Sequence, residues 1–521
     1  MENDFLLQQA KLLLAALVAY VLFNALDESH QSMLPALLSG LQTDTASVLS
    51  SAAISTGVTA RRLLLSPKHS EQLSLEGHLP SAQLQQEQQI HQPFAKLNYS
   101  WAYQNPAADR PHKSLTSHKD PDALLYTHMG MLDVLPTGQI AAVWQGSTQY
   151  WEGGSKQSLY WAVSEDGGAS WGKPQVVVPP AAGGLPVWGP VLHVEDGRVW
   201  LFYAASKSQC GQWGEAGQGY SPGGDILRII SDDNGSTWSQ PEVVWAFSEE
   251  GGIPKVVANK LAVAHNGNWV LPFWHEAVSE ACGSKLDVNQ AAGVLVSSDK
   301  GMTWSMARIK ALGNSWLIEA SITAVTSPEE PPALLQMFRT GLGSIFQSWS
   351  VDGGLTWSAP IPSDLPNPNS KVHVTRLPTG KLLLAYNNDS DTGVRSPLTL
   401  ASSKDGGQTW QPAAIIEDDP AGSFSYPTIQ YVPASNRVLV IYSVAYQEAA
   451  PAQAQDDLYA EDGHPGGAKV GASRQPGVPR LPEAQDRKGA GAGGGAAEGV
   501  GAWGWTAYGM KVASLDAAPF L

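Results

Sequence analysis

The sequence has few of the features that mark nucleic-acid-binding, metal-dependent or redox proteins. Its 521 residues include two cysteines, only 15% charged residues and no extended run of lysines or arginines, and the formal net charge is −16 at pH 7. Phosphate groups are bound by clustered Lys and Arg side chains, so this charge argues against a nucleic-acid or anionic-membrane partner. No ligand spacing typical of a metal site occurs, and we expect neither a metal nor a cofactor.

The amino terminus lacks a hydrophobic stretch long enough to span a membrane comfortably. Leu12–Leu26 is uncharged and follows Lys11, but it is shorter than the ~20 residues that a transmembrane helix needs. We interpret residues 1–26 as a signal peptide or signal anchor, with a buried globular helix as the alternative. The first two interpretations predict a secretory-pathway protein, either secreted or tethered to a Golgi or cell-surface membrane by this segment only. Residues 27–94 are interpreted as a stalk or disordered linker.

Cysteine is rare enough to limit cross-linking within the chain. Cys210 and Cys282 allow one disulfide, and their spacing does not decide between that bridge and two free thiols. Sequons begin at Asn98, Asn234 and Asn388, and they permit glycosylation if the chain is secreted.

The most informative feature is an eight-residue pattern, Ser-x-Asp-x-Gly-x-(Thr/Ser)-Trp, that occurs five times. The copies are SEDGGASW, SDDNGSTW, SSDKGMTW, SVDGGLTW and SKDGGQTW, which begin at residues 164, 231, 297, 350 and 403. The intervals between these starting residues are those expected when each copy marks one repeating unit of four strands. Asp and Gly suit a tight turn, the Ser and Asp oxygens bond nearby N–H groups, and Trp packs beneath. We interpret the pattern as a structural turn that locates the blades of a propeller.

Short apolar strands lie between these turns. Six of them are predicted at residues 139–145, 199–204, 269–274, 334–338, 381–386 and 438–443. The six strands predict six blades, so we expect residues 95–515 to form an all-β, six-bladed β-propeller. Residues 447–500 are rich in Ala, Gly, Pro and Gln, and we interpret them as a disordered low-complexity insertion within the last blade. A strand at residues 505–513 is then expected to complete that blade.

Because of these repeats, the chain resembles the sialidase superfamily, whose members are neuraminidase-like propellers with BNR repeats. Within that superfamily it resembles a divergent, sialidase-like branch. The repeats are similar to that family's Asp box, and the resemblance covers roughly residues 120–515. It implies five Asp-box turns, and it is more specific for the fold than for activity. Sialidases have three arginines that bind the substrate carboxylate, a tyrosine nucleophile polarised by a glutamate, and an acid/base aspartate, and the resemblance implies a similar set here.

Two stretches of the sequence are similar to the segments that carry these residues. The order of motifs from residue 367 to residue 443 implies that Arg395 is one of the arginines and that Tyr426 is the nucleophile. Upstream, Glu319 and Arg339 occupy segments similar to those of the glutamate and another arginine. Glu319 lies in an apolar run, where a carboxylate is costly unless it is paired. A structural ion pair between Glu319 and an arginine is the alternative to a catalytic role.

The first blade departs from the family pattern. Where the first arginine is expected, the chain has His128, and no aspartate occupies the acid/base loop, where Glu152 is the nearest carboxylate. We expect His128 to replace the third carboxylate ligand, and Glu152 to act as the general acid if burial raises its pKa. The Tyr426 hydroxyl should then lie roughly 2.6–3.2 Å from Glu319, with Arg339 and Arg395 facing the same cavity.

These residues predict a retaining glycoside hydrolase that releases a terminal acidic sugar, such as sialic acid, from a glycan or glycoconjugate. One alternative is a polysaccharide lyase, in which Tyr426 or His128 removes a proton next to the carboxylate of a uronate. The other alternative is a glycan-binding propeller without catalytic activity, which the absence of one arginine favours.

Overall fold

The computed structural model describes residues 97–106, 122–149, 151–209, 211–213, 218–276, 292–310, 316–325, 332–447 and 505–521. All of these residues belong to the unit Gln85–Leu521. The predictions for residues 1–26 and 27–94, for Cys210 and Cys282, and for the insertion at 447–500 apart from Gln447 lie outside the described residues. Within the described ranges, no helix has the length and apolar character needed to cross a membrane.

Three sheets are four-stranded meanders in chain order. The first contains β2 (Tyr126–Val134), β3 (Ile140–Ser147), β4 (Ser158–Ser164) and β5 (Gln175–Val178). The second contains β17 (Ile318–Val325), β18 (Ala333–Arg339), β19 (Gly343–Ser350) and β20 (Ile361–Asn367). The third contains β21 (His373–Arg376), β22 (Leu382–Asn387), β23 (Leu398–Ser403) and β24 (Gln411–Glu417).

A larger sheet of nine strands consists of two such meanders joined by one short strand. One meander is β6 (Val187–Glu195), β7 (Arg198–Ser206), β10 (Gly224–Ser231) and β11 (Glu242–Trp245). The other is β13 (Ala262–Val263), β14 (Trp269–His275), β15 (Ala292–Ser297) and β16 (Ser305–Arg308). The joining strand, β12 (Lys255–Val256), pairs with both β10 and β14. A separate hairpin is formed by β8 (Gly211–Trp213) and β9 (Gln218–Tyr220).

The last sheet joins the two ends of the described domain. Its order is β25 (Gly422–Val432), β26 (Arg437–Gln447), β27 (Trp505–Asp516) and β1 (Asn98–Gln104). The strand expected at residues 505–513 is therefore present as β27, and it lies between β26 and β1. Three short 3₁₀ helices, Glu249–Gly251, Pro433–Ser435 and Ala518–Phe520, lie in the connections and at the carboxyl terminus.

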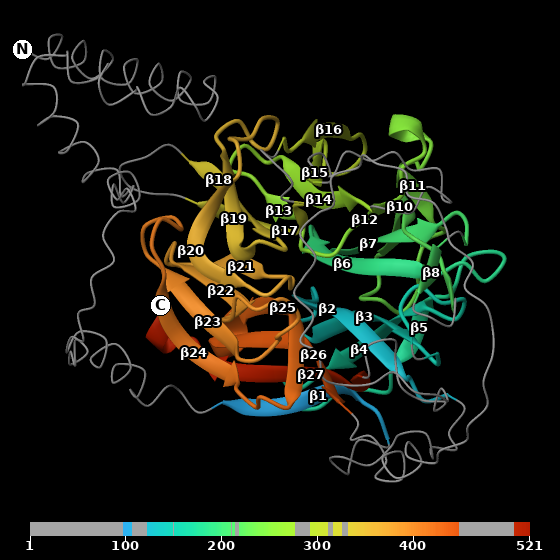
Figure 1. Cartoon of the computed structure of the whole chain (residues 1–521), viewed down its shortest axis with the longest axis horizontal. Helices are drawn as coiled ribbons and strands as arrows, with labels where there is room; N and C mark the ends of the chain where they lie inside the picture. Colours follow the sequence, from blue (N-terminus) through green and yellow to red (C-terminus); the bar gives the residue numbers. More distant parts are fainter. Residues whose placement is uncertain are drawn as a thin grey trace, which may run out of the picture. The chain divides into compact units, whose positions relative to one another are not determined.

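The sheets are arranged around a central axis as a β-propeller (Figure 1). The first strand of each meander packs against its neighbours: β2 against β6 and β25, β21 against β17 and β25, and β13 against β17. This arrangement confirms the predicted all-β propeller. The second strands are buried on both faces between adjacent sheets, as in β3, β14 and β22, whose residues are all buried. Their continuous apolar runs follow from that two-sided burial.

All five repeated turns connect the third and fourth strands of a meander. In each one the Ser hydroxyl donates to the Asp carboxylate at 2.7 or 2.8 Å and accepts a Gly N–H at 2.7–2.9 Å. In four of them the Trp indole donates to a Gly carbonyl at 2.9–3.2 Å. Hydrogen bonds within the turn lower the pKa of Asp166, Asp233 and Asp299 to about 2. The turn is therefore held together by contacts within its own eight residues.

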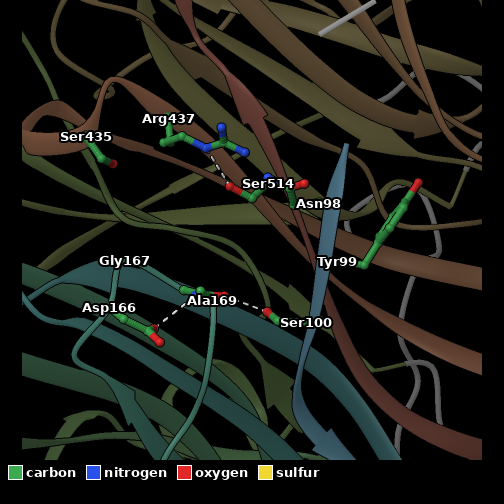
Figure 2. Close-up of a pocket in the computed structure, with 10 residues that line it drawn as sticks. Asn98, Tyr99, Ser100, Asp166, Gly167, Ala169, Ser435, Arg437 and Ser514 are labelled. Atoms are coloured by element: carbon green, nitrogen blue, oxygen red, sulfur yellow. Dashed lines mark hydrogen bonds between the residues drawn. The ribbon is translucent and has the colours of Figure 1, made fainter. Parts of the chain in front are cut away.

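The first of these turns differs because it is bonded to β1. The Trp171 indole donates to Ser100 Oγ at 3.1 Å, and Ser100 Oγ donates to the Gly168 carbonyl at 2.6 Å. A cavity of about 290 Å³ lies beside this contact (Figure 2). Its lining contains none of the predicted site residues; it consists of Asn98, Tyr99, Ser100, Asp166, Gly167, Gly168, Ala169, Ser435, Arg437 and Ser514.

The register of the last sheet allows a test of how the propeller is closed. Gln447 lies opposite Trp505, so a two-residue turn can join β26 to β27. We expect a chain in which Asn-Gly replaces residues 448–504 to unfold in one cooperative transition near that of the full chain. A chain that ends at residue 504 loses β27, so β1 has no partner strand, and we expect no cooperative transition. Melting curves followed by circular dichroism check both, and cooperative unfolding of the truncated chain would contradict the prediction.

Candidate active site

Four first strands carry the same irregularity at one level of the propeller. β2, β6, β17 and β25 each contain one extra residue relative to the partner strand. At this point the backbone φ is positive: 54° at Met129, 51° at Gly189, 48° at Glu319 and 58° at Tyr426. Bulges of this kind redirect side chains, and non-glycine residues in this region of φ are strained. Two of the predicted site residues thus lie at strained bulges on different sheets.

Tyr426 on β25 and Glu319 on β17 meet directly. The Tyr426 hydroxyl donates to Glu319 Oε1 at 2.6 Å. Arg339 on β18 donates through Nη1 to both carboxylate oxygens of Glu319 at 2.9 Å, and also to the Tyr426 hydroxyl. Glu319 is 3% exposed and Tyr426 is 4% exposed. A carboxylate buried to this degree needs a paired charge, and Arg339 supplies it.

The protonation of this group follows from its burial. Burial raises the pKa of the Tyr426 phenol far above its usual value, and the positive charge of Arg339 opposes that rise. The phenol is therefore protonated at neutral pH, with its proton directed at Glu319. Such a carboxylate can accept the proton when the phenol oxygen forms a new bond.

Arg395 contacts the same tyrosine from the loop that precedes β23. Its guanidinium carbon lies 5.2 Å from the centre of the Tyr426 ring, and its Nη1 donates to Ser425 Oγ at 3.3 Å. The described residues offer its other guanidinium nitrogens no hydrogen bond. Arg339 is more fully engaged, because its Nε also donates to Asn369 Oδ1 at 2.7 Å. Arg395 is therefore the more available cation of the two.

His128 on β2 lies against the face of Tyr426. The two ring centres are 3.8 Å apart, and His128 Nδ1 is 2.9 Å from Ser443 Oγ. Burial, and after it the positive charges of Arg395, Arg339 and Lys371, keep the pKa of His128 well below its usual value. His128 is thus in the expected place, but it is neutral at pH 7 and adds a hydrogen-bonding group rather than a third positive charge.

Glu152 belongs to a second polar group beside the first. Its Oε1 accepts from Gln145 Nε2 at 2.7 Å, and the same nitrogen donates to the Tyr126 hydroxyl at 3.0 Å. Gln145 Oε1 accepts the N–H of Gly189 at 2.9 Å, which anchors this group to the β6 bulge. Burial raises the pKa of Glu152, and its charge acts on Tyr426. Glu152 is therefore an oriented carboxyl group that retains a proton at higher pH than an exposed glutamate.

Three residues outside the predicted set take part in this arrangement. Gln145 orients Glu152, and Asn369 binds Arg339. Glu276 follows β14 and accepts the Trp274 indole N–H at 2.7 Å. Burial raises the pKa of Glu276 to about 7, and the charges of Glu152 and Glu319 act in the same direction. In the structure, only Asn369 among these three has an unusual backbone, with a φ of 61°. In the sequence, no spacing connects the three residues.

Comparisons with known proteins identify the family of the chain. The chain matches the family described as BNR repeat-like domain over residues 138–437. It is similar to a sialidase of Micromonospora viridifaciens, with 28% identity over an alignment of 334 residues. The match covers 58% of this chain and 47% of the relative. It is also similar to an anhydrosialidase of Macrobdella decora, with 27% identity over 143 residues, 26% of this chain and 17% of the relative. The chain thus spans about half the length of the first relative and less of the second.

Among solved structures, the fold is similar to that of a mutant of Trypanosoma rangeli sialidase displaying trans-sialidase activity. The TM-score is 0.50 at 15% identity, and the match covers 67% of this chain and 57% of that chain. At this identity the likeness concerns the fold alone. The family match covers more than half of the 521 residues. The chain therefore belongs to the family of BNR repeat-like domains and is a distant homologue of sialidases.

Proposed function

We propose that this protein is a retaining glycoside hydrolase that releases a terminal acidic sugar, sialic acid or a related one, from a glycan. The observation that carries the proposal is the buried hydrogen bond of 2.6 Å between the Tyr426 hydroxyl and Glu319. A neutral phenol is a weak nucleophile, and an adjacent carboxylate activates it by accepting its proton. The names of the two curated relatives, a sialidase and an anhydrosialidase, support the same class of substrate.

The first step forms a covalent intermediate. The Tyr426 oxygen attacks the anomeric carbon while its proton passes to Glu319. The bond to the leaving oxygen breaks, and this oxygen takes the proton of Glu152. Burial raises the pKa of Glu152, which suits a general acid near neutral pH.

The second step returns the enzyme to its starting state. Glu152, now ionised, removes a proton from a water molecule that attacks the anomeric carbon. The bond to Tyr426 breaks, and the phenol recovers its proton from Glu319. Two displacements at one carbon retain the configuration of the sugar.

The acidic group of the sugar is assigned to the arginines. Arg395 provides guanidinium N–H groups without partners among the described residues, and planar guanidinium groups match a carboxylate. Arg339 contributes Nη2, because Nη1 and Nε already bind Glu319, Tyr426 and Asn369. His128 adds a neutral hydrogen-bonding group where the family has a third arginine.

The neutral state of His128 favours one second candidate, a lyase acting on uronate-containing glycans. An uncharged imidazole that lies 3.8 Å from the Tyr426 ring, centre to centre, can accept a proton from the carbon next to a carboxylate. The glycosidic bond would then break by elimination and leave an unsaturated sugar. Ultraviolet absorbance of that product, which hydrolysis does not generate, distinguishes the two reactions.

We also infer that the propeller has six blades. The nine-stranded sheet divides at β12 into two meanders of four strands, and each has its own Asp-box turn. Together with the three separate meanders and the sheet that β1 completes, these two make six.

Replacing Tyr426 with Phe removes the proposed nucleophile and leaves the ring in place. We expect Tyr426→Phe to lower kcat for a fluorogenic α-sialoside by on the order of 10³-fold or more, with the melting temperature retained. Tyr431→Phe is the matched control, because Tyr431 lies on the same strand and its hydroxyl donates to Asn436 instead. Equal activity of the Tyr426 variant and the control would exclude the nucleophile. No turnover by the wild-type protein on sialosides or uronate-capped glycans would favour a glycan-binding propeller.

The pH dependence of turnover tests Glu152. A general acid must be protonated, so kcat/KM should fall as pH rises through the raised pKa of Glu152. We expect Glu152→Gln to lose ~10²-fold or more in kcat/KM for substrates with poor leaving groups and to lose this alkaline limb. Glu165→Gln in the exposed part of the first Asp box is the control. An unchanged alkaline limb in Glu152→Gln would transfer the acid role to another group.

A further inference from the structure

Tyr426, Glu319 and Arg339 form what we call the Tyr426 group. The short segment between β20 and β21 bonds Arg339 directly and the other two through their neighbours. Asn369 Oδ1 accepts Arg339 Nε at 2.7 Å. The Val372 carbonyl accepts Asn259 Nδ2 at 3.2 Å, and the same Asn259 nitrogen donates to the Glu319 carbonyl at 2.8 Å. Asn259 thus links this segment to the bulge that presents Glu319.

Lys371 lies between Asn369 and Val372 in this segment, and it contacts the bulge that contains Tyr426. Lys371 is fully buried, with 0% of its surface exposed. Its Nζ donates to the Pro427 carbonyl at 2.7 Å and to Thr428 Oγ1 at 3.2 Å. Pro427 directly follows Tyr426, and it has no N–H with which to join the strand ladder. Lys371 Nζ therefore bonds the carbonyl of the second of the two bulge residues, directly after Tyr426.

The same contact extends to the bulge that carries His128. Thr428 Oγ1, which accepts from Lys371, donates to the Gly130 carbonyl on β2 at 2.9 Å. His128 and Gly130 lie two residues apart in that bulge. Lys371 is thus the buried donor at the junction of β2, β25 and the segment before β21.

Burying the amine of Lys371 costs free energy, because the charged form loses its hydration. Burial lowers the pKa of Lys371 to about 7, and the negative charge of Glu319 opposes that change. Burial lowers the pKa of His128 and of His373, the first residue of β21, and the charge of Lys371 acts in the same direction. A neutral amine keeps two N–H groups, so both bonds persist on either side of pH 7. A leucine or methionine would fill the same space without that cost.

We propose that Lys371 is a positioning residue that holds the Tyr426 phenol in line for reaction by bonding the Pro427 carbonyl and Thr428. This role rests on the proposed function, because it concerns the rate of the step that Tyr426 carries out. A misplacement of a reacting group by about 1 Å can cost ~10²-fold in rate. Lys371 should therefore affect kcat more than substrate binding, which the arginines provide.

The chain offers a matched control for this proposal. Lys255 on β12 is also 0% exposed, and its Nζ also donates to main-chain carbonyls, those of Ala246, Phe247, Glu249 and Ile253. These carbonyls belong to the connection between β11 and β12, not to the Tyr426 group. Lys255→Met removes a buried amine of the same kind without altering the Tyr426 bulge.

The experiment compares Lys371→Met and Lys255→Met by turnover and by NMR of protein labelled with ¹³Cζ-tyrosine, in which Tyr426→Phe assigns the Tyr426 signal. We expect Lys371→Met to lower kcat by 10- to 100-fold with KM changed by less than about 3-fold, and to shift or broaden the Tyr426 signal. Lys255→Met should lower the melting temperature and leave both readouts as in the wild type.

Each outcome decides the proposal. An unchanged Tyr426 signal in Lys371→Met overturns it, whether or not the wild type turns over a substrate. Equal losses of kcat in the two lysine variants also overturn it, because they indicate a general effect of stability. If the wild type is inactive on every glycan, the proposed function fails, and the NMR comparison alone decides whether Lys371 positions Tyr426. If Lys371→Met does not fold, Thr428→Val, which removes one of the two acceptors, is judged by the same readouts.

Discussion

The rest of the site depends on one buried contact, the hydrogen bond from the Tyr426 hydroxyl to Glu319, with Arg339 bound to both. An ionised carboxylate in an apolar interior is costly without a paired charge, and loss of one partner from such a pair is strongly destabilising. Glu319 and Arg339 therefore hold each other in place, and the tyrosine shares their geometry. Glu319 can lie in an apolar stretch of sequence because Arg339 pairs with its carboxylate inside the fold.

The propeller places these groups by means of its bulges. Glu319 and Tyr426 adopt positive φ values of 48° and 58°, which cost free energy and persist only where the surroundings enforce them. The enforcing contacts come from Asn259 and Lys371, which bond the carbonyls of Glu319 and Pro427. Strain at the site is thus balanced by hydrogen bonds from two buried side chains, Asn259 and Lys371.

The site departs from the sialidase pattern at two positions. His128 contributes no charge, because its pKa is lowered first by burial and then by the neighbouring cations. Glu152 is the carboxyl group nearest to the expected position of the acid/base aspartate, and Gln145 Nε2 donates to its Oε1 at 2.7 Å. Of the two arginines, Arg339 is already bonded to Glu319, Tyr426 and Asn369. We therefore propose that recognition of an acidic sugar depends more on Arg395 than on an equal contribution from both arginines.

The sequence by itself determined the propeller class, because its evidence is local. In an Asp box, Ser164 bonds Asp166 two residues away, and the second strands appear as apolar runs because both of their faces are buried. The predicted site residues were available only through the family resemblance, and their roles stay predictions. Their convergence was decided by the tertiary structure: Tyr426 and Glu319 are 107 residues apart, and His128 and Ser443 are 315 apart. The supporting roles of Asn259, Asn369 and Lys371 could not be predicted from the sequence, because a buried amide or amine is recognised as a support only from the carbonyls and side chains that the fold brings to it.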